Sequence, residues 1–340
     1  MNPPRPLAAG DVVPRIGLLN AAGAVVELDH QSTAGNALVL WLCGPAARPA
    51  PGFAAPETLL YAVVASAPAA VEGAVLFDPE NRMAAAFGLG GPAIVVIDAG
   101  RHVAAILPDG DFTGAAQVCA RLHAATGTNL VTRQAPVLVI PDVLEPALCA
   151  ALIAYWEGGE KRHDGVAAQA ARDYADPGIK KRTDVGVVDP ALIATLQDRV
   201  NRRIVPEVAK AFRRPVRYLE SFRIGCYDAD SGGYFRRHRD NTTRYTAHRL
   251  FAVTLNLNTG QYQGGALRFP EYGRMPYAPA AGGAVVFSCA LLHEALPVTA
   301  GRRFGLFTFM HDEEGERAVQ RLIAEEHAAG RTGLQLQPAR

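Results

Sequence analysis

Short runs of uninterrupted apolar residues dominate the first third of the chain. Residues 37–42 and 93–97 are apolar throughout and as long as a strand, the pattern expected of strands that are buried on both faces. A further run at 103–107 is expected to pair beside 93–97, and residues 112–125 predict a closing helix. Strands that alternate with helices in this way indicate an α/β sandwich within residues 1–130.

The pattern changes after the aperiodic stretch 127–136, which we interpret as a linker. A strand then leads into a helix that begins at Pro146, a residue favoured at the first helical position. A second helix begins at Asp189 and has apolar residues four apart from 192 to 212, with a bend expected at Pro206. These two amphipathic helices are expected to pack against one face of a sheet.

Short strands follow the helices. Residues 251–258 alternate, so that Phe251, Val253, Leu255 and Leu257 are expected to face a core while Ala252, Thr254, Asn256 and Asn258 face an interior. Residues 165–179 lack any period and predict either a mobile loop over a functional site or, the interpretation we favour, a surface loop. The pattern therefore predicts a second domain at 135–315, followed by a charged helix and tail at 316–340.

Composition and charge limit the possible partners. The 340 residues suggest about two domains, and 49% hydrophobic with 20% charged residues is an ordinary globular composition. A net charge of +1 favours neither nucleic acid nor an acidic membrane surface as a partner. We interpret the basic clusters at 180–182 and 236–237 as solvated charges.

The five cysteines indicate a reducing compartment. They form no C-x-x-C pair and lie mostly in apolar surroundings, which is typical of buried thiols rather than of a disulfide framework. The N-terminus lacks an apolar segment of signal-peptide length, and no apolar run reaches the roughly 18 residues that cross a bilayer. We therefore expect a cytoplasmic location and no association with a membrane.

One group of polar residues has the composition of a metal site. On a strand, His238 and Asp240 would project from one face, since side chains alternate. With a distant histidine such as His293, they can form the 2-His-1-carboxylate triad that holds Fe(II) with open positions. Arg303 follows ten residues after His293 and can grip a carboxylate, although alternation lets only one of Arg302 and Arg303 face inward. The alternative for His238 and Asp240 is an ordinary surface pair.

These residues, in this order, resemble the prolyl 4-hydroxylase-like Fe(II)/2-oxoglutarate dioxygenases. The resemblance covers roughly residues 136–312 and rests on His238, Asp240, His293, Arg303 and the segments 226–227, 232–235, 256–258, 264–269 and 282–287. It implies a double-stranded β-helix, or jelly roll. It also implies Fe(II) and 2-oxoglutarate, with ascorbate as a further candidate cofactor, and hydroxylation with O2 that releases succinate and CO2.

The same resemblance implies roles for single residues. His238, Asp240 and His293 would be the metal ligands, and Arg303 would bind the C5 carboxylate of 2-oxoglutarate. Tyr227 would add a hydroxyl donor, although a plain core tyrosine is an equally good interpretation. Peptidyl proline is the best-known substrate of the family, but the fold does not determine the substrate. A protein, a peptide or a small molecule therefore all stay open.

The N-terminal domain resembles a thioredoxin-like redoxin of the peroxiredoxin type. The matching segments are 10–14, 76–80, 86–89 and 91–98, with Pro92 where that fold commonly carries a cis-proline. The peroxidatic cysteine motif is absent, because Cys43 lacks the threonine at the required spacing and prolines interrupt the following segment. We therefore interpret residues 1–130 as a catalytically inactive redoxin domain. Thiol peroxidase chemistry at Cys43 and a non-catalytic docking role are the alternative functions.

Overall fold

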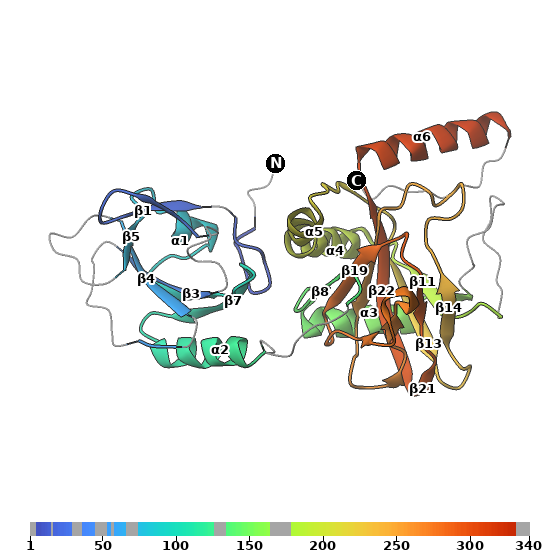
Figure 1. Cartoon of the computed structure of the whole chain (residues 1–340), viewed down its shortest axis with the longest axis horizontal. Coiled ribbons are helices and arrows are strands. Elements are labelled where there is room, and N and C mark those ends of the chain that lie inside the picture. Colours follow the sequence, from blue (N-terminus) through green and yellow to red (C-terminus); the bar gives the residue numbers. More distant parts are fainter. Residues whose placement is uncertain are drawn as a thin grey trace. The chain divides into compact units, whose positions relative to one another are not determined.

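The chain folds into two compact units, residues Met1–Leu130 and Val131–Arg340. Figure 1 shows the computed structural model. It describes residues 5–14, 16–28, 36–44, 53–55, 58–65, 74–125, 134–163 and 178–330. The linker predicted at 127–136 and the loop predicted at 165–179 lie largely outside these described residues.

The first unit is built on a mixed sheet of seven strands in the order β2-β1-β5-β4-β3-β6-β7. β3 runs parallel to β4 and antiparallel to β6, which also pairs antiparallel with β7. The predicted strands 37–42, 93–97 and 103–107 and the predicted helix 112–125 are confirmed. The elements are β1 (Gly17–Asn20), β2 (Val25–Glu27), β3 (Ala37–Gly44), β4 (Thr58–Val64), β5 (Val75–Phe77), α1 (Arg82–Ala86), β6 (Ala93–Ile97), β7 (Val103–Pro108) and α2 (Phe112–Ala125).

The central strands of this sheet are buried on both faces, as their unbroken apolar runs predict. On β3, Leu38 and Leu40 pack into one apolar cluster, whereas Val39 and Trp41 pack into another on the opposite face. At the end of β3 the Cys43 side chain is buried, and its Sγ donates to the carbonyl of Trp41 at 3.3 Å. No peptide bond among the described residues is cis, so Pro92 follows a trans bond where the redoxin resemblance implied a cis one.

The second unit has two antiparallel sheets that enclose a cavity. The larger sheet has the order β8-β19-β15-β22-β13-β11-β9, with β12 added beside β22. The smaller sheet has the order β10-β14-β20-β17-β18, and a ribbon joins β16 and β21. The strands are β8 (Val137–Ile140), β9 (Arg162–His163), β10 (Lys180–Lys181), β11 (Thr183–Gly186), β12 (Tyr218–Leu219), β13 (Arg223–Asp228), β14 (Tyr234–His238), β15 (Phe251–Asn256), β16 (Gln263–Gly264), β17 (Leu267–Arg268), β18 (Pro276–Tyr277), β19 (Ala284–Ser288), β20 (His293–Ala295), β21 (Val298–Ala300) and β22 (Arg302–His311).

Helices cover the outer face of the larger sheet. They are α3 (Pro146–Gly158), α4 (Pro190–Arg203) and α5 (Val205–Phe212), with a 3-10 turn η1 (Pro270–Tyr272) and a closing helix α6 (Glu313–Ala328) elsewhere in the unit. Their apolar stripes form one core with the sheet, in which Leu152 and Leu196 pack with Val253 and Leu306. The predicted charged C-terminal helix is confirmed as α6, and residues 331–340 lie outside the described part of the chain.

The predicted single helix with a bend at Pro206 is wrong. The segment divides into α4 and α5 at Ile204, and Pro206 lies in the first turn of α5. A proline has no amide hydrogen to donate, and its ring clashes with the carbonyl four residues earlier, so the helix ends before it. The predicted start is confirmed, because Asp189 Oδ1 accepts a hydrogen bond from the Leu192 amide at 2.7 Å.

The predicted alternation along β15 is confirmed and determines which side chains reach the cavity. Val253 and Leu255 pack in the helix-covered core, while Ala252 and Thr254 line the cavity between the sheets. No helix in the described part of the chain is long and apolar enough to span a bilayer.

Candidate metal centre

The smaller sheet brings two histidines together. His238 ends β14 and His293 begins β20, and the two residues are direct partners in the antiparallel pairing of these strands. Their ring centroids are 4.1 Å apart. A register shift between Phe235 and His238 marks a bulge in β14, a device that commonly re-aims a side chain near a site.

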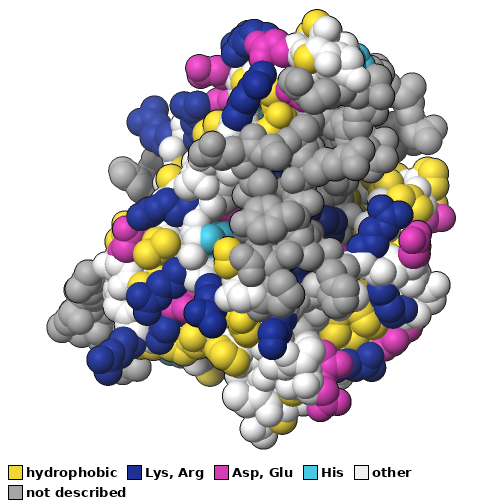
Figure 2. All heavy atoms as spheres, turned by 90° about the vertical axis from the view of Figure 1, so that its right-hand side faces the viewer, with side chains coloured by type: hydrophobic (Ala, Val, Ile, Leu, Met, Phe, Trp, Pro, Cys, Tyr) yellow, Lys and Arg dark blue, Asp and Glu magenta, His cyan; other side chains and the backbone are white. Residues whose placement is uncertain are grey.

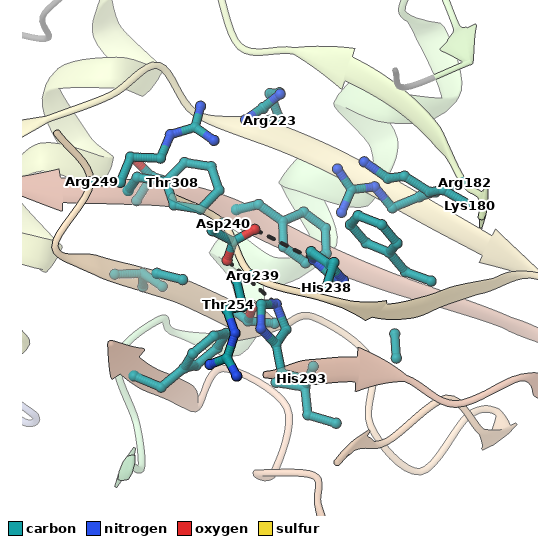
Figure 3. A pocket seen from close by; sticks show the side chains of 18 of the residues that line it. Lys180, Arg182, Arg223, His238, Arg239, Asp240, Arg249, Thr254, His293 and Thr308 are labelled. Atoms are coloured by element: carbon teal, nitrogen blue, oxygen red, sulfur yellow. Dashed lines mark ion pairs between the residues drawn. The ribbon is translucent and has the colours of Figure 1, made fainter. Parts of the chain in front are cut away.

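Asp240 completes the cluster from outside the strand. The expectation that His238 and Asp240 share a strand is wrong, because β14 ends at His238 and Asp240 lies in the following turn. The Asp240 amide donates to the carbonyl of Cys289 at 2.9 Å, which ties this turn to the segment that precedes His293. The carboxylate oxygens of Asp240 lie 3.4 Å from the Nε2 atoms of His238 and of His293 (Figure 3). The three ligand atoms lie within 4.8 Å of one another.

Backbone carbonyls determine which nitrogen of each ring carries the hydrogen. His238 Nδ1 lies 2.7 Å from the carbonyl oxygen of Arg236, and His293 Nδ1 lies 3.0 Å from that of Leu291. A carbonyl oxygen only accepts hydrogen bonds, so each Nδ1 carries a hydrogen and donates it. In the neutral rings both Nε2 lone pairs then point at the carboxylate of Asp240. Three electron pairs converge on one point, and this arrangement fits a bound cation.

The ionisation of the cluster also suits a metal. Burial lowers the pKa of His293 to about 4, against a smaller opposing effect of the Asp240 charge, so this imidazole is neutral at pH 7. Burial would raise the pKa of Asp240, but below the pH at which the two histidines lose their protons, the charge of His293 and the hydrogen bond and charge of His238 outweigh it and hold that pKa well below its usual range. Two neutral imidazoles and one carboxylate are the donor set of the facial triad.

Arg303 lies in the same cavity as a buried cation with free donors. It is 2% exposed, whereas its neighbour Arg302 is exposed and pairs with Glu157 at 2.8 Å. Its Nη2 donates to Asn256 Oδ1 at 3.1 Å, while its Nε and Nη1 are buried with no hydrogen-bond partner among the described residues. Buried guanidinium donors without a partner are costly, and their presence indicates a place for an anion.

Glycine makes room for this arginine at a position that sequence reasoning missed. Gly265, at a φ of +67°, lies so close that an added Cβ would be 3.0 Å from Arg303 Cδ. Gly305, two residues after Arg303 on β22, accommodates Phe307, since a Cβ there would lie 2.7 Å from the phenyl ring. Tyr227 is the direct strand partner of Arg303 and is 2% exposed. The Arg303 guanidinium lies 5.2 Å from the centre of its ring.

The cavity around these residues has a volume of about 260 Å³ and a basic wall. Its basic side chains are Lys180, Arg182, Arg223, Arg239, Arg249 and Arg303. The interpretation of the cluster at 180–182 as solvated is wrong for two of its members, since Lys180 and Arg182 are 7% and 8% exposed. The R-x-D spacing of Arg182 and Asp184 could have indicated that Arg182 is buried, because the two side chains form two hydrogen bonds of 2.6 Å.

Known proteins match this half of the chain. Residues 222–311 match the family model of the 2OG-Fe(II) oxygenase superfamily. The matched segment contains His238, Asp240, His293, Arg303 and Tyr227. These findings support an Fe(II)- and 2-oxoglutarate-dependent hydroxylase.

Three individual proteins are similar to this half of the chain. A PKHD-type hydroxylase of Paraburkholderia phymatum is 28% identical over 222 residues, covering 58% of this chain and 93% of the relative. A PKHD-type hydroxylase of Azoarcus sp. is 31% identical over 116 residues, covering 32% of this chain and 50% of the relative. The structure of a prolyl hydroxylase from Trichoplax adhaerens, in complex with a hypoxia inducible factor peptide, has a TM-score of 0.46 and 18% identity, with 54% of this chain and 86% of that chain covered.

Proposed function

We propose that residues 131–340 form a double-stranded β-helix that hydroxylates a C–H bond with O2 and 2-oxoglutarate, releasing succinate and CO2. The observation that carries the proposal is the convergence of two Nε2 lone pairs on the Asp240 carboxylate. His238, Asp240 and His293 are the proposed ligands of Fe(II). When bound, the iron supplies the oxidative chemistry and keeps positions open for 2-oxoglutarate and O2.

The proposed role of Arg303 is to bind the C5 carboxylate of 2-oxoglutarate. Its Nε and Nη1 lack hydrogen-bond partners in the part of the chain that the structure describes, and a carboxylate can accept from both in the fork geometry that arginine favours. Tyr227 is proposed to flank the same carboxylate, since it is the strand partner of Arg303. Its hydroxyl oxygen accepts from Arg182 Nη1 at 3.3 Å, which leaves the phenolic hydrogen available to donate.

The substrate we propose is a protein or peptide, with a prolyl residue as the first target to test. The motif resemblance supports this choice. The readout is a mass gain of one oxygen atom on candidate peptides incubated with Fe(II), 2-oxoglutarate and O2. Ascorbate in the same assay tests whether it sustains turnover.

For residues 1–130 we propose a thioredoxin-like domain that recognises the substrate. The parallel pairing of β3 with β4 and the antiparallel pairing of β3 with β6 support that fold. The burial of Cys43 favours recognition over thiol chemistry. Removal of residues 1–130 should leave 2-oxoglutarate turnover intact and abolish substrate hydroxylation. The five buried free thiols support a cytoplasmic location.

An anaerobic absorption experiment tests the metal assignment. Fe(II) and 2-oxoglutarate together should produce a weak visible charge-transfer band in the wild-type protein. Asp240→Ala should abolish both the band and succinate release, whereas Asp230→Ala, at an exposed carboxylate on the loop before β14, should change neither. A band of unchanged intensity in Asp240→Ala would reject the assignment.

A further inference from the structure

Two asparagines, at the end of β15 and two residues beyond it, hold the part of β22 from which Arg303 projects. Asn258 Nδ2 donates to the carbonyl of Arg302 at 2.8 Å, and Asn258 Oδ1 accepts from the amide of Phe304 at 2.9 Å. One side chain therefore bonds the main chain on both sides of Arg303. Asn256 bonds the side chain of Arg303 itself, because its Oδ1 accepts from Nη2 at 3.1 Å. The backbone and the guanidinium of Arg303 are thus both held from one short segment.

The side-chain amide of Asn256 has a single favourable orientation. A guanidinium only donates hydrogen bonds, so the atom that faces Arg303 is the amide oxygen. On the other side, Asn256 Nδ2 donates to Thr259 Oγ1 at 3.0 Å and to the carbonyl of Pro279 at 3.4 Å. Asn256 is 3% exposed, and a flipped amide would bury its donor against the donors of Arg303. These contacts fix the point at which the amide oxygen holds the guanidinium.

A neutral partner distinguishes Arg303 from other arginines with little exposure in the same unit. Three of them are each held by a carboxylate: Arg182 by Asp184 at 2.6 Å, Arg203 by Glu145 at 2.9 Å and Arg249 by Glu220 at 2.6 Å. For Arg303 the only hydrogen-bond acceptor among the described residues is the amide of Asn256. The one carboxylate in the described lining of the cavity, Asp240, belongs to the proposed metal centre. The described part of the empty protein therefore leaves the charge of Arg303 without a carboxylate partner.

Burial makes this charge a strong attractor for an anion. Figure 2 shows numerous Lys and Arg side chains on the surface, where water solvates their charges. Arg303 is 2% exposed and lacks that solvation. A bound carboxylate supplies the missing opposite charge in a medium of low dielectric constant. A carboxylate at position 256 would supply it permanently, so the co-substrate would have to displace a group of the protein.

We infer that Asn256 is a positioning residue for the co-substrate: its amide oxygen orients the guanidinium of Arg303, and its neutrality reserves the positive charge of Arg303 for the C5 carboxylate of 2-oxoglutarate. This inference rests on the proposed hydroxylase function. Asn256 acts through Arg303 and need not touch the co-substrate. Its effect should therefore depend on the C5 carboxylate and not on the part of the co-substrate that binds the metal.

Two co-substrates that differ only at C5 test this inference on the full chain. 2-Oxopentanoate has the same chain length as 2-oxoglutarate but a methyl group in place of the C5 carboxylate. Calorimetric titration at neutral pH, with Mn(II) in the proposed metal site, gives the Kd of each compound without any turnover. The wild-type protein should bind 2-oxoglutarate about a hundredfold or more tightly than 2-oxopentanoate, and we call this ratio of Kd values the C5 preference.

Asn256→Asp changes the charge of the partner while keeping its shape. The hydroxyl of Thr259 can donate to the oxygen that replaces Nδ2, and the new carboxylate would pair with Arg303. The C5 preference should fall about tenfold or more, through weaker binding of 2-oxoglutarate, while the Kd of 2-oxopentanoate stays within about threefold of the wild-type value. Asn201→Asp is the matched control, because it adds the same charge at an exposed position on α4 and should leave the C5 preference unchanged.

Other outcomes each have a defined meaning. A wild-type C5 preference in folded Asn256→Asp overturns the inference, and so does an equal weakening of both co-substrates, which would show a structural role only. If Asn256→Asp does not fold, Asn256→Ala provides the test: the C5 preference should fall about threefold or more, because Nη2 of Arg303 loses its acceptor, and an unchanged preference overturns the inference. A wild-type protein without any C5 preference rejects the proposed role of Arg303 itself, and the absence of the anaerobic absorption band rejects the hydroxylase.

Discussion

Arg303→Met removes a cation that the folded protein has placed among apolar and aromatic groups. The side chain is 2% exposed, and its hydrogen bond to Asn256 uses only one of its three nitrogens. Methionine has a similar length and flexibility, so it fills the same space without the charge. The substitution therefore separates what Arg303 does for the empty protein from what it does for the bound co-substrate.

The substitution should weaken the complex with 2-oxoglutarate but should not destabilise the empty protein. In the complex, two charge-assisted hydrogen bonds from Nε and Nη1 contribute about 3–6 kcal/mol in total, so their loss should raise the Kd of 2-oxoglutarate by about 10²- to 10⁴-fold. In the empty protein no described residue accepts from those donors. An apolar replacement of such a group is neutral or stabilising, so the variant should melt at the same or a higher temperature.

Thermal unfolding with added co-substrate measures both effects in one assay. The wild-type Tm should rise as 2-oxoglutarate is added, by an amount that corresponds to about 2.7 kcal/mol at a concentration of one hundred times Kd. Arg303→Met should show no such rise at the same concentration. Arg302→Met is the matched control, because the Arg302 side chain is exposed and pairs with Glu157 outside the cavity.

Two results would refute this reasoning about Arg303. A Kd for 2-oxoglutarate within about threefold of the wild-type value, in a folded variant, would show that the carboxylate binds elsewhere. A large fall in the Tm of the empty protein would show that Arg303 has a structural role that the free donors do not reveal. Calorimetric titration of both variants provides the Kd independently of unfolding.

Further predictions concern three other positions. Acidification from pH 6.5 to 4 should destabilise the metal-free protein more than its His293→Gln variant, as measured by urea unfolding. The reason is that His293 binds a proton below about pH 6.5 in the unfolded chain but only near pH 4 in the folded protein. Parallel pH profiles of the two proteins would contradict this. Gly265→Ala should weaken 2-oxoglutarate binding about tenfold, since the added Cβ would press on Arg303 Cδ. Gly260→Ala is the control: Gly260 also has a positive φ but has open space around it, so this substitution should lower only the stability of the fold. Cys43 should be alkylated in the native protein more slowly than free cysteine, because its side chain is buried; an equal or faster rate would revive the thiol hypothesis.

Patterns of apolar residues were sufficient to predict the elements whose burial is uniform or alternates regularly. The unbroken runs of β3 and β6 could only be central strands, and the alternation along β15 correctly separated the helix-covered face from the cavity face. Alternation along β22 allowed only one of Arg302 and Arg303 to face inward, and the family resemblance then selected Arg303, the buried one of the two. In each case the local period of the sequence determines which face is buried.

Features that depend on long-range pairing could not be predicted. The burial of Lys180 follows from the pairing of β10 with β14, and no local pattern in a run of three basic residues indicates it. The position of Asp240 depends on the end of β14 and on a hydrogen bond to Cys289, which lies 49 residues later in the chain. The break between α4 and α5 was missed because the apolar spacing continues across Ile204.

The orientation of the two imidazoles by main-chain carbonyls has an evolutionary consequence. Each ring is held by the peptide group two residues before it, and no side chain contributes to that bond. Substitutions in the cavity wall can therefore reshape substrate preference while both rings keep their alignment. Natural or designed changes of specificity are therefore compatible with this scaffold, because the orientation of the two rings depends on the backbone.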